Sequence, residues 1–270
     1  MALIDCFIFY NELEMLAYRM NVLGPIVDWV VLVESRHTFT GKEKECTYEL
    51  NKNTEALAKF RGKIVHIIVD DFPFKYPNID YAKGEQWSNE HFQRNCIMRG
   101  LNQLNLCPDD IFTITDLDEI PDPNTLLEVK SRETQIAVNS LEMDFYYYNL
   151  NSRIANKWLF PKIVSYGVFQ QNGWTCQQCR WFTNAVVIQR GGWHLSYFGD
   201  EHFIKNKIQH FSHQEFNTDE YTDLSKIEHR VNDSTDLFDR GDNPVSKISS
   251  YHNDYLPPEH GGFVSKNILY

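Results

Sequence analysis

Three carboxylates crowd into four residues of this chain, at Asp116, Asp118 and Glu119. They directly follow the run 111–115, whose β-branched and aromatic residues predict a buried strand. Ligands of open α/β sheets bind beyond the carboxyl ends of the strands, so the cluster stands where a site is expected. Asp116 and Asp118 are two residues apart, so in an extended chain both would lie on one side, with Leu117 directed into the core.

The chemistry that this pair favours is the binding of a hard cation. Two carboxylates on one side suit Mg²⁺ or Mn²⁺, with diphosphate oxygens and waters completing the shell. One hypothesis is therefore an Asp-x-Asp metal clamp for a nucleotide diphosphate. The other is a solvated acidic turn that caps the helix expected from 121–123, because aspartate is common at such caps. The acidic pattern alone leaves both open.

The elements before the cluster alternate in a way that would position it. Apolar and β-branched runs predict strands, and periodic apolar residues predict helices. The expected strands are 3–10, 27–33, 63–69 and 111–115, and the expected helices are 12–23, 54–60 and 84–104. Strand, helix and strand in succession imply a parallel sheet, which is typical of a doubly wound nucleotide-binding half. Arg94, in the last of these helices, is either a surface cation or a charge that meets a diphosphate.

The residue pattern changes after Pro123. A short helix to about residue 130 precedes aromatic-rich strands at 135–150, 160–169 and 180–190, and a helix at 204–216. This pattern predicts a mixed or antiparallel extension that shapes an acceptor groove, whose aromatic rings could stack on sugars or fill the core. The last forty residues are loop-rich. We expect one α/β domain over 1–270, with a nucleotide-binding half at 1–122 and an acceptor-side half with a C-terminal wrap at 123–270.

Composition narrows the class of protein. With 42% apolar residues among 270, the chain can build a substantial core. The formal net charge of −11 argues against nucleic acid as a partner. No run of eighteen apolar residues exists, so no membrane segment is expected.

The cysteines and histidines add two smaller hypotheses. Six scattered cysteines suit a reducing compartment, and Cys176 and Cys179 have the spacing of half a zinc site, but no second pair matches it and they lie in an aromatic strand pattern. Seven of the ten histidines follow residue 190, and one of them could complete a metal shell begun by Asp118.

Several short motifs together resemble glycosyltransferase family 17, the family of β-1,4-mannosyl-glycoprotein 4-β-N-acetylglucosaminyltransferase. They occur in the expected order over roughly the first 220 residues, which is more specific than any one motif. The matching stretches are 9–13, 33–35, 38–42, 93–95, 110–121, 192–198 and 212–216. The resemblance implies a GT-A type nucleotide-sugar-binding fold, with a mixed, mostly parallel central sheet flanked by helices. It also implies a UDP-GlcNAc donor, a glycan acceptor and Mn²⁺-dependent (Mg²⁺ possible) inverting transfer, with a β-1,4 linkage.

The same resemblance assigns roles to individual residues. Asp118 would ligate the metal directly, Asp116 would lie nearer the ribose or a metal-bound water, and His194 would be the third protein ligand. The donor would be met by a further set of residues: Glu34 at the uridine, Arg94 at the nucleotide or diphosphate, Lys42 nearby, and Trp193 next to the metal ligand.

Inversion needs a carboxylate that takes the proton of the acceptor hydroxyl. The sequence does not single it out, and the candidates are Glu119, Glu142, Asp144, Asp200, Glu201 and Glu215. Glu215 is preferred because it shares a matching stretch with His213, although a simple hydrogen bond on a helix face would explain that pair equally well.

Two other classes of function compete with the transferase. A non-catalytic module on the same fold would bind sugar nucleotides or glycans without turnover, and a nucleotidyltransferase would release pyrophosphate. The second lacks support, because no Gly-rich phosphate loop follows the first strand. The compact chain resembles microbial or viral members, so we expect a soluble protein of the cytoplasm, of the host if viral. The Golgi lumen would apply only if an anchor had been removed. The acceptor and the oligomeric state stay open.

Overall fold

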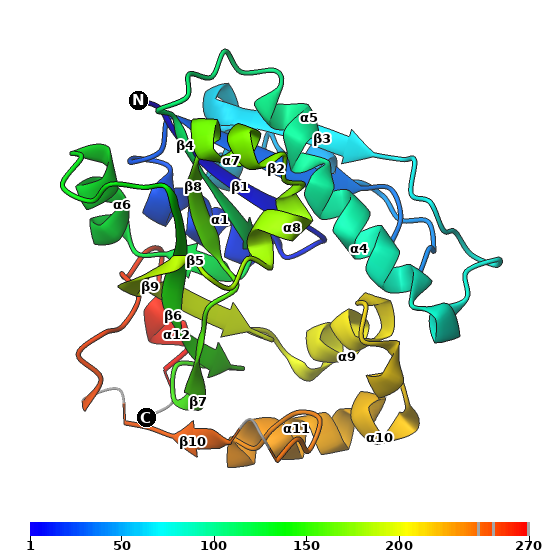
Figure 1. The fold of residues 1–270 in the computed structure, drawn as a ribbon. Coiled ribbons are helices and arrows are strands. Elements are labelled where there is room, and N and C mark those ends of the chain that lie inside the picture. Colours follow the sequence, from blue (N-terminus) through cyan, green and yellow to red (C-terminus); the bar gives the residue numbers. More distant parts are fainter. Residues whose placement is uncertain (242–243, 250–251, 269–270) are drawn as a thin grey trace.

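The computed structural model describes residues 1–241, 244–249 and 252–268. Within these residues one ten-stranded sheet runs through the molecule, in the order β10-β7-β6-β8-β4-β1-β2-β3, with β9 joined to both β6 and β5 (Figure 1). The strands are β1 (Leu3–Phe9), β2 (Trp29–Ser35), β3 (Ile64–Val69), β4 (Ile111–Asp116), β5 (Glu119–Pro121), β6 (Val138–Tyr147), β7 (Ser152–Trp158), β8 (Lys162–Ser165), β9 (Val186–Ser196) and β10 (Val245–Lys247). The expected mixed, mostly parallel sheet flanked by helices is confirmed.

Helices flank the sheet. They are α1 (Leu13–Leu23), α2 (Thr47–Asn51), α3 (Glu55–Ala58), α4 (Glu85–Asn95), α5 (Ile97–Leu101), α6 (Pro123–Lys130), α7 (Tyr166–Asn172), α8 (Cys176–Arg180), α9 (Glu201–His210), α10 (Asp219–Thr222), α11 (Leu224–Asp233) and α12 (Phe263–Lys266). None of the described helices is long and apolar enough to cross a bilayer.

The parallel part of the sheet brings β3, β2, β1 and β4 side by side. Their unbroken apolar runs suit strands that are buried on both faces, and Val31, Phe112 and Ile114 are fully buried. Leu117 is also buried, as its position between two aspartates predicts. Because β4 ends at Asp116, the acidic turn lies at the carboxyl edge of this parallel part.

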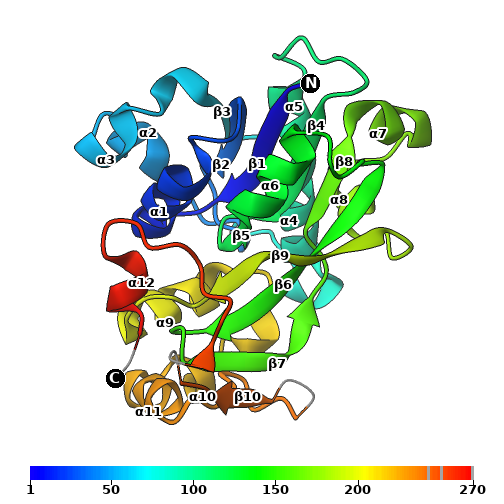
Figure 2. The same cartoon turned by 90° about the vertical axis from the view of Figure 1, so that its left-hand side faces the viewer.

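The later strands return to the acidic turn from far along the chain. β8 pairs antiparallel with β4, β6 pairs with β8, and β9 runs parallel to β6. The short β5 then pairs antiparallel with β9 (Figure 2). The register of this pair sets Glu119 opposite His194. This pairing brings the acidic turn after β4 next to His194 of β9.

The C-terminal segment closes over the first helix. α12 lies next to α1 (Figure 2). Phe263 of α12 stacks on Tyr18 of α1 with ring centroids 4.0 Å apart, and Lys266 binds Glu14 at 2.7 Å. The last forty residues were expected to be a loop-rich wrap, and among the residues described there the helices and strands are the end of α11, the short β10 and α12.

Several predicted boundaries are wrong. The helix expected over 84–104 is two helices, because the backbone tightens at Cys96, whose N–H reaches the carbonyls of both Phe92 and Gln93. The strand expected over 160–169 ends at Ser165 and continues as α7, and the strand expected over 180–190 begins only at Val186.

The segment with Cys176 and Cys179 is helical, whereas its aromatic pattern predicted a strand. Thr175 accepts a hydrogen bond from the backbone N–H of Gln178, and the side chain of Gln178 accepts one from Thr175. This reciprocal capping box starts a helix, and its Thr-x-x-Gln signature is present in the sequence.

Candidate active site

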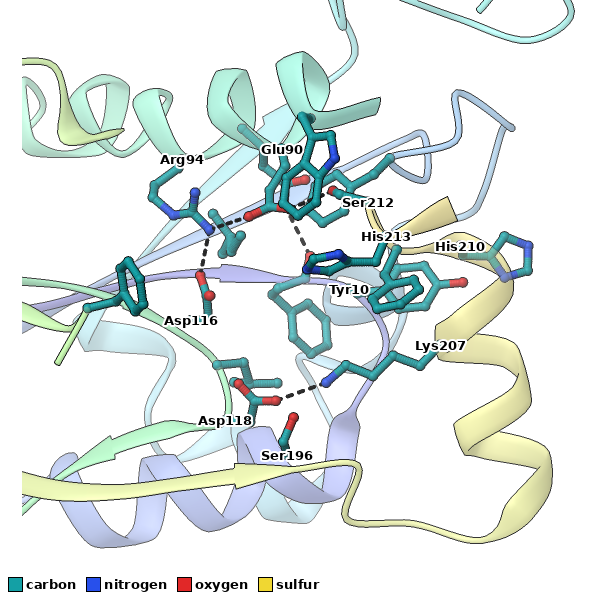
Figure 3. Close-up of a pocket in the computed structure, with 18 of the residues that line it drawn as sticks. Tyr10, Glu90, Arg94, Asp116, Asp118, Ser196, Lys207, His210, Ser212 and His213 are labelled. Carbon is teal, nitrogen blue, oxygen red and sulfur yellow. Dashed lines mark hydrogen bonds and ion pairs between the residues drawn. The ribbon is translucent and has the colours of Figure 1, made fainter. Parts of the chain in front are cut away.

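A cavity of about 400 Å³ opens beyond the carboxyl ends of β1, β2 and β4. Its walls come from the segments after β1 and β2, from α4, from the turn between β4 and β5, and from β6, β7, α8, β9 and α9. Asp116, Asp118 and His194 all line it. Figure 3 shows both aspartates directed into the space between α4 and α9, Asp116 toward Arg94 and Asp118 toward Lys207.

Asp116 is held by two arginines. Arg94 Nη2 donates to its Oδ1 and Arg180 Nη2 to its Oδ2, both at 2.9 Å. Burial would raise the pKa of Asp116, but the two guanidinium groups outweigh burial and lower it. The carboxylate is therefore charged at neutral pH, and 30% of the side chain is exposed to the cavity. Arg94 is 1% exposed, so it is not the surface cation of the alternative hypothesis.

Asp118 has different partners. Lys207 Nζ donates to its Oδ2 at 2.9 Å, and His194 Nε2 lies 3.6 Å from its Oδ1. Burial again opposes ionisation, but Lys207 and His194 hold the pKa of Asp118 well below its usual range. Lys207 has a second carboxylate within reach, Glu12 Oε1 at 3.6 Å. Burial would lower the pKa of Lys207, yet the aspartate and Glu12 raise it, so the ammonium is charged.

Arg19 on α1 is fully buried and holds the acidic turn from behind. Its Nη1 donates to the carbonyl oxygens of Asp116, Leu117 and Glu119 at 2.8–3.0 Å. Its Nε and Nη2 donate to the two carboxylate oxygens of Asp5 at 2.8 and 2.6 Å. The turn is thus fixed by a charge-assisted network that does not itself line the cavity.

The metal hypothesis can be tested on the donor atoms present. No cluster of three or more His, Cys, Asp or Glu side chains suited to a metal occurs in the part of the chain that the structure describes. The 3.6 Å between Asp118 and His194 is short enough for one small cation, about 2 Å from each ligand atom, to touch both. Each oxygen of Asp116 already accepts a hydrogen bond from an arginine, so Asp116 is a less available ligand than Asp118 and His194. The residues fit a cation that takes two protein ligands and completes its shell with water and phosphate oxygens.

His194 is oriented by aromatic rings. It stacks on Phe145 with centroids 4.3 Å apart and lies 4.7 Å from Trp158. Its Nδ1 is buried and lacks a hydrogen-bond partner within the described residues. Its neighbour Trp193 faces the opposite side of β9, where it is buried and donates from Nε1 to the carbonyl of Tyr255 at 3.0 Å. Trp193 does not line the cavity.

Two further residues expected at the donor also lie away from the cavity. Glu34 is fully buried, accepts from the backbone N–H of Tyr48 at 3.1 Å, and lies 3.1 Å from His66 Nε2. Lys42 is exposed on the loop after β2. The cavity wall from this loop is formed instead by His37, Thr38, Phe39 and Lys44.

None of the six carboxylates named as candidates for the base lines the cavity. Glu119 is fully buried and binds Arg180 through both oxygens, at 2.6 and 2.8 Å, and Trp158 Nε1 at 2.5 Å. Asp144 is buried against Lys157 and Arg153.

Glu215 reaches the cavity only through a neighbour. It lies beside the cavity in a second hollow, with its Oε1 2.6 Å from Nδ1 of His213, which does line the cavity. The expected Glu215–His213 contact therefore exists, with the imidazole on the cavity side.

Sequence reasoning did not assign a role to six charged residues that line the cavity. They are Glu12, Lys44, Glu90, Arg180, Lys207 and Arg240. Glu90 binds Arg94 at 2.8 Å one turn along α4, and Ser212 Oγ donates to its other oxygen at 2.5 Å (Figure 3). The i, i+4 spacing of Glu90 and Arg94 was visible in the sequence, but nothing local marks Arg180 or Lys207 as partners of the aspartates.

Comparisons with known proteins show the family of this chain. A model of glycosyltransferase family 17 matches residues 1–243. The chain is 30% identical over 122 residues to the beta-1,4-mannosyl-glycoprotein 4-beta-N-acetylglucosaminyltransferases of Homo sapiens and Rattus norvegicus. These matches cover 44% of this chain and 22% of each relative, so the chain spans about a fifth of the length of the curated relatives it matches.

Among solved structures, the crystal structure of S. aureus TarS residues 1–349 is 12% identical, with a TM-score of 0.44, covering 85% of this chain and 72% of that one. The galactosyltransferase LgtC with donor and acceptor sugar analogs is 11% identical, with a TM-score of 0.32, covering 93% and 90%. The sheet is mixed, mostly parallel and flanked by helices. The family match extends over most of the sequence, so the chain belongs to glycosyltransferase family 17.

Proposed function

We propose that this protein transfers N-acetylglucosamine from UDP-GlcNAc to a hydroxyl of a glycan acceptor with inversion, forming a β-1,4 linkage. The observation that carries the proposal is the pair Asp116 and Asp118, which lines a cavity at the carboxyl end of β4 and is held there by cations. The curated relatives, named as N-acetylglucosaminyltransferases, support the choice of sugar.

The donor fits the cavity with its nucleoside toward β1 and β2 and its diphosphate at the aspartates. Tyr10, His37 and Phe39 line the first side, and the Nδ1 of His37 is buried without a partner among the described residues. The guanidinium of Arg94 would lie next to the diphosphate. In this proposal Glu34 and Lys42 brace and flank the loop after β2, and Trp193 anchors β9 behind His194.

The local charge favours recruitment of a divalent cation. Within the network around the aspartates, the carboxylates outnumber the cations by two: five carboxylates (Glu12, Glu90, Asp116, Asp118 and Glu119) meet three cations (Arg94, Arg180 and Lys207). Adding a diphosphate would increase this excess. We therefore propose that Asp118 and His194 hold Mn²⁺, or Mg²⁺, with Asp116 in support. When bound, such a cation neutralises charge on the departing diphosphate.

His213 and Glu215 are the proposed base. As the acceptor oxygen bonds to the anomeric carbon, the bond from that carbon to the diphosphate breaks, and UDP leaves with the electron pair. The hydroxyl proton passes to Nε2 of His213, while Nδ1 shares its hydrogen with Glu215 at 2.6 Å. A single displacement of this kind inverts the anomeric carbon. The buried ion pairs of Glu119 and Asp144 make these two carboxylates positioning groups in this scheme.

UDP release tests the proposal. With UDP-GlcNAc and Mn²⁺, the wild-type protein is expected to release UDP, and Asp118→Ala is expected to reduce the rate by about a hundredfold or more. Asp71→Ala is a matched control, because Asp71 pairs with Arg99 on the surface and does not line the cavity. Thermal unfolding of both variants checks that they fold.

The outcomes separate the alternatives. Release of pyrophosphate in place of UDP would indicate a nucleotidyltransferase. Binding of UDP-GlcNAc without release of UDP, with or without an oligosaccharide mixture, would indicate a binding module on the same fold. Equal rates for wild type and Asp118→Ala would refute the role given to the aspartate pair.

A further inference from the structure

Trp181 is an exposed aromatic residue at the cavity. It directly follows α8, has 60% of its surface exposed, and lines the same cavity as Asp116. Only five aromatic side chains are exposed among the residues that the structure describes (Trp29, Tyr76, Tyr81, Phe160 and Trp181), and an indole ring left open at a cavity edge points to a ligand. His91 of α4 contacts this ring edge-on, with centroids 5.8 Å apart, and also lines the cavity.

A polar group lies one helical turn before this ring. Gln177 lines the cavity, and its Oε1 accepts a hydrogen bond from Arg94. Its Nε2 is buried and has no partner among the described residues. A buried donor without a partner is unfavourable, and a ligand oxygen would satisfy it. Residues four apart on a helix share a face, so Gln177 and Trp181 would meet one ligand together.

A ring face beside an amide donor suits a sugar. A pyranose presents an apolar face of C–H groups, which packs on an aromatic ring, and hydroxyl oxygens at its rim, which accept from an amide. The same two groups offer little to a diphosphate, which needs positive charge.

The position of α8 assigns this sugar to the acceptor. In the sheet, β4 lies between β1 on one side and β8 on the other, and α8 follows β8 and α7 in the chain. The nucleoside is proposed on the β1 and β2 side, so α8 stands on the other side of Asp116. Arg180 of α8 binds that aspartate directly, which places the ring of Trp181 next to the point of transfer.

We propose that Trp181, Gln177 and His91 form a subsite that binds a pyranose ring of the acceptor glycan, with the indole ring as its platform. This inference rests on the proposed transfer reaction and specifies which surface selects the acceptor. The matched control is Trp29, a tryptophan that is 38% exposed at the start of β2 and does not line the cavity.

The experiment compares Trp181→Ala, Trp181→Phe and Trp29→Ala with the wild type. An array of mannose- and N-acetylglucosamine-terminated oligosaccharides first identifies the probe that accepts most labelled sugar. With that probe, Trp181→Ala is expected to raise the acceptor KM about tenfold, which is close to 1.4 kcal/mol. Trp181→Phe keeps an aromatic face and is expected to recover most of the loss. All three variants are expected to bind UDP with the wild-type Kd, measured by titration calorimetry.

Two results would overturn the subsite. One is an acceptor KM that is the same in Trp181→Ala and wild type. The other is a loss in Trp181→Ala that the phenylalanine variant does not recover, because that pattern indicates a structural defect and no stacking. Failure of the wild type to release UDP from UDP-GlcNAc would instead count against the proposed function.

Discussion

Each aspartate of the cavity already has a cation beside it. Lys207 Nζ lies 2.9 Å from Oδ2 of Asp118, the carboxylate that would bind a metal. A second carboxylate, that of Glu12, lies 3.6 Å from the same ammonium. A lysine between two carboxylates can shift from one to the other without losing all compensation. The side chain therefore competes with a metal at Asp118 and retains Glu12 as a partner when displaced.

Replacing this lysine should strengthen binding of the bare metal. Lys207→Met leaves Asp118 charged and unpaired apart from His194, so we expect the Kd for Mn²⁺ without nucleotide to fall by about tenfold. The amount of free Mn²⁺, followed by electron paramagnetic resonance at neutral pH, measures this change. Lys205→Met, on the same helix but outside the cavity, should leave the Kd unchanged. Equal affinities in wild type and Lys207→Met would show that the lysine does not compete.

At the scale of elements, the site depends on the contact of β5 with β9. This antiparallel pair sets Glu119 opposite His194 and Pro121 opposite Gly192. Gly192 has φ +144°, and a Cβ there would stand 2.1 Å from the carbonyl oxygen of Ile120. Only glycine allows the two strands to approach this closely.

Gly192→Ala is therefore expected to disturb both stability and the site. We expect the free energy of unfolding to fall by about 3 kcal/mol, because β5 must move away from β9. Gly173→Ala is the control: it also has a positive φ, +62°, but nothing lies within 4 Å of its added Cβ, so a loss of about 1 kcal/mol is expected. Urea unfolding measures both. A Gly192→Ala protein no less stable than Gly173→Ala would show that the approach is not tight.

The sequence predicted the strands of the parallel half and the acidic turn, because each depends on local patterns of apolar and charged residues. It did not predict which distant charges meet that turn. Arg180 and Lys207 come from α8 and α9, and their contacts with Asp116 and Asp118 depend on strand pairing that no local pattern encodes. Arg19 was detectable in part, since it interrupts the apolar face of α1 between buried Leu16 and Leu23.

For the molecule as a whole, one sheet joins the two halves that the sequence suggested. β4 pairs with β8 and β5 pairs with β9, so the first 122 residues have strands whose partners lie beyond that point. Ile120 packs in the same hydrophobic cluster as Leu141, Ile163 and Trp193. We propose that 1–270 is a single folding unit.

Truncation tests this proposal. A fragment of residues 1–122 is expected to lack a cooperative thermal transition and to bind the dye ANS, because β4 and β5 would expose the apolar surfaces that β8 and β9 cover. The full chain is expected to unfold in one transition by circular dichroism and by tryptophan fluorescence. A fragment that unfolds cooperatively with dispersed amide signals would show that the first half is a domain by itself.

Arg19 binds three carbonyl groups of the acidic turn, those of Asp116, Leu117 and Glu119, and this has a consequence for ligand entry. Because the backbone that carries Asp116 and Asp118 is anchored from the core, it has its final shape before any donor arrives. Little conformational entropy remains to be lost there on binding, so the ordering that accompanies donor capture is expected in side chains such as Lys207 and not in the acidic turn.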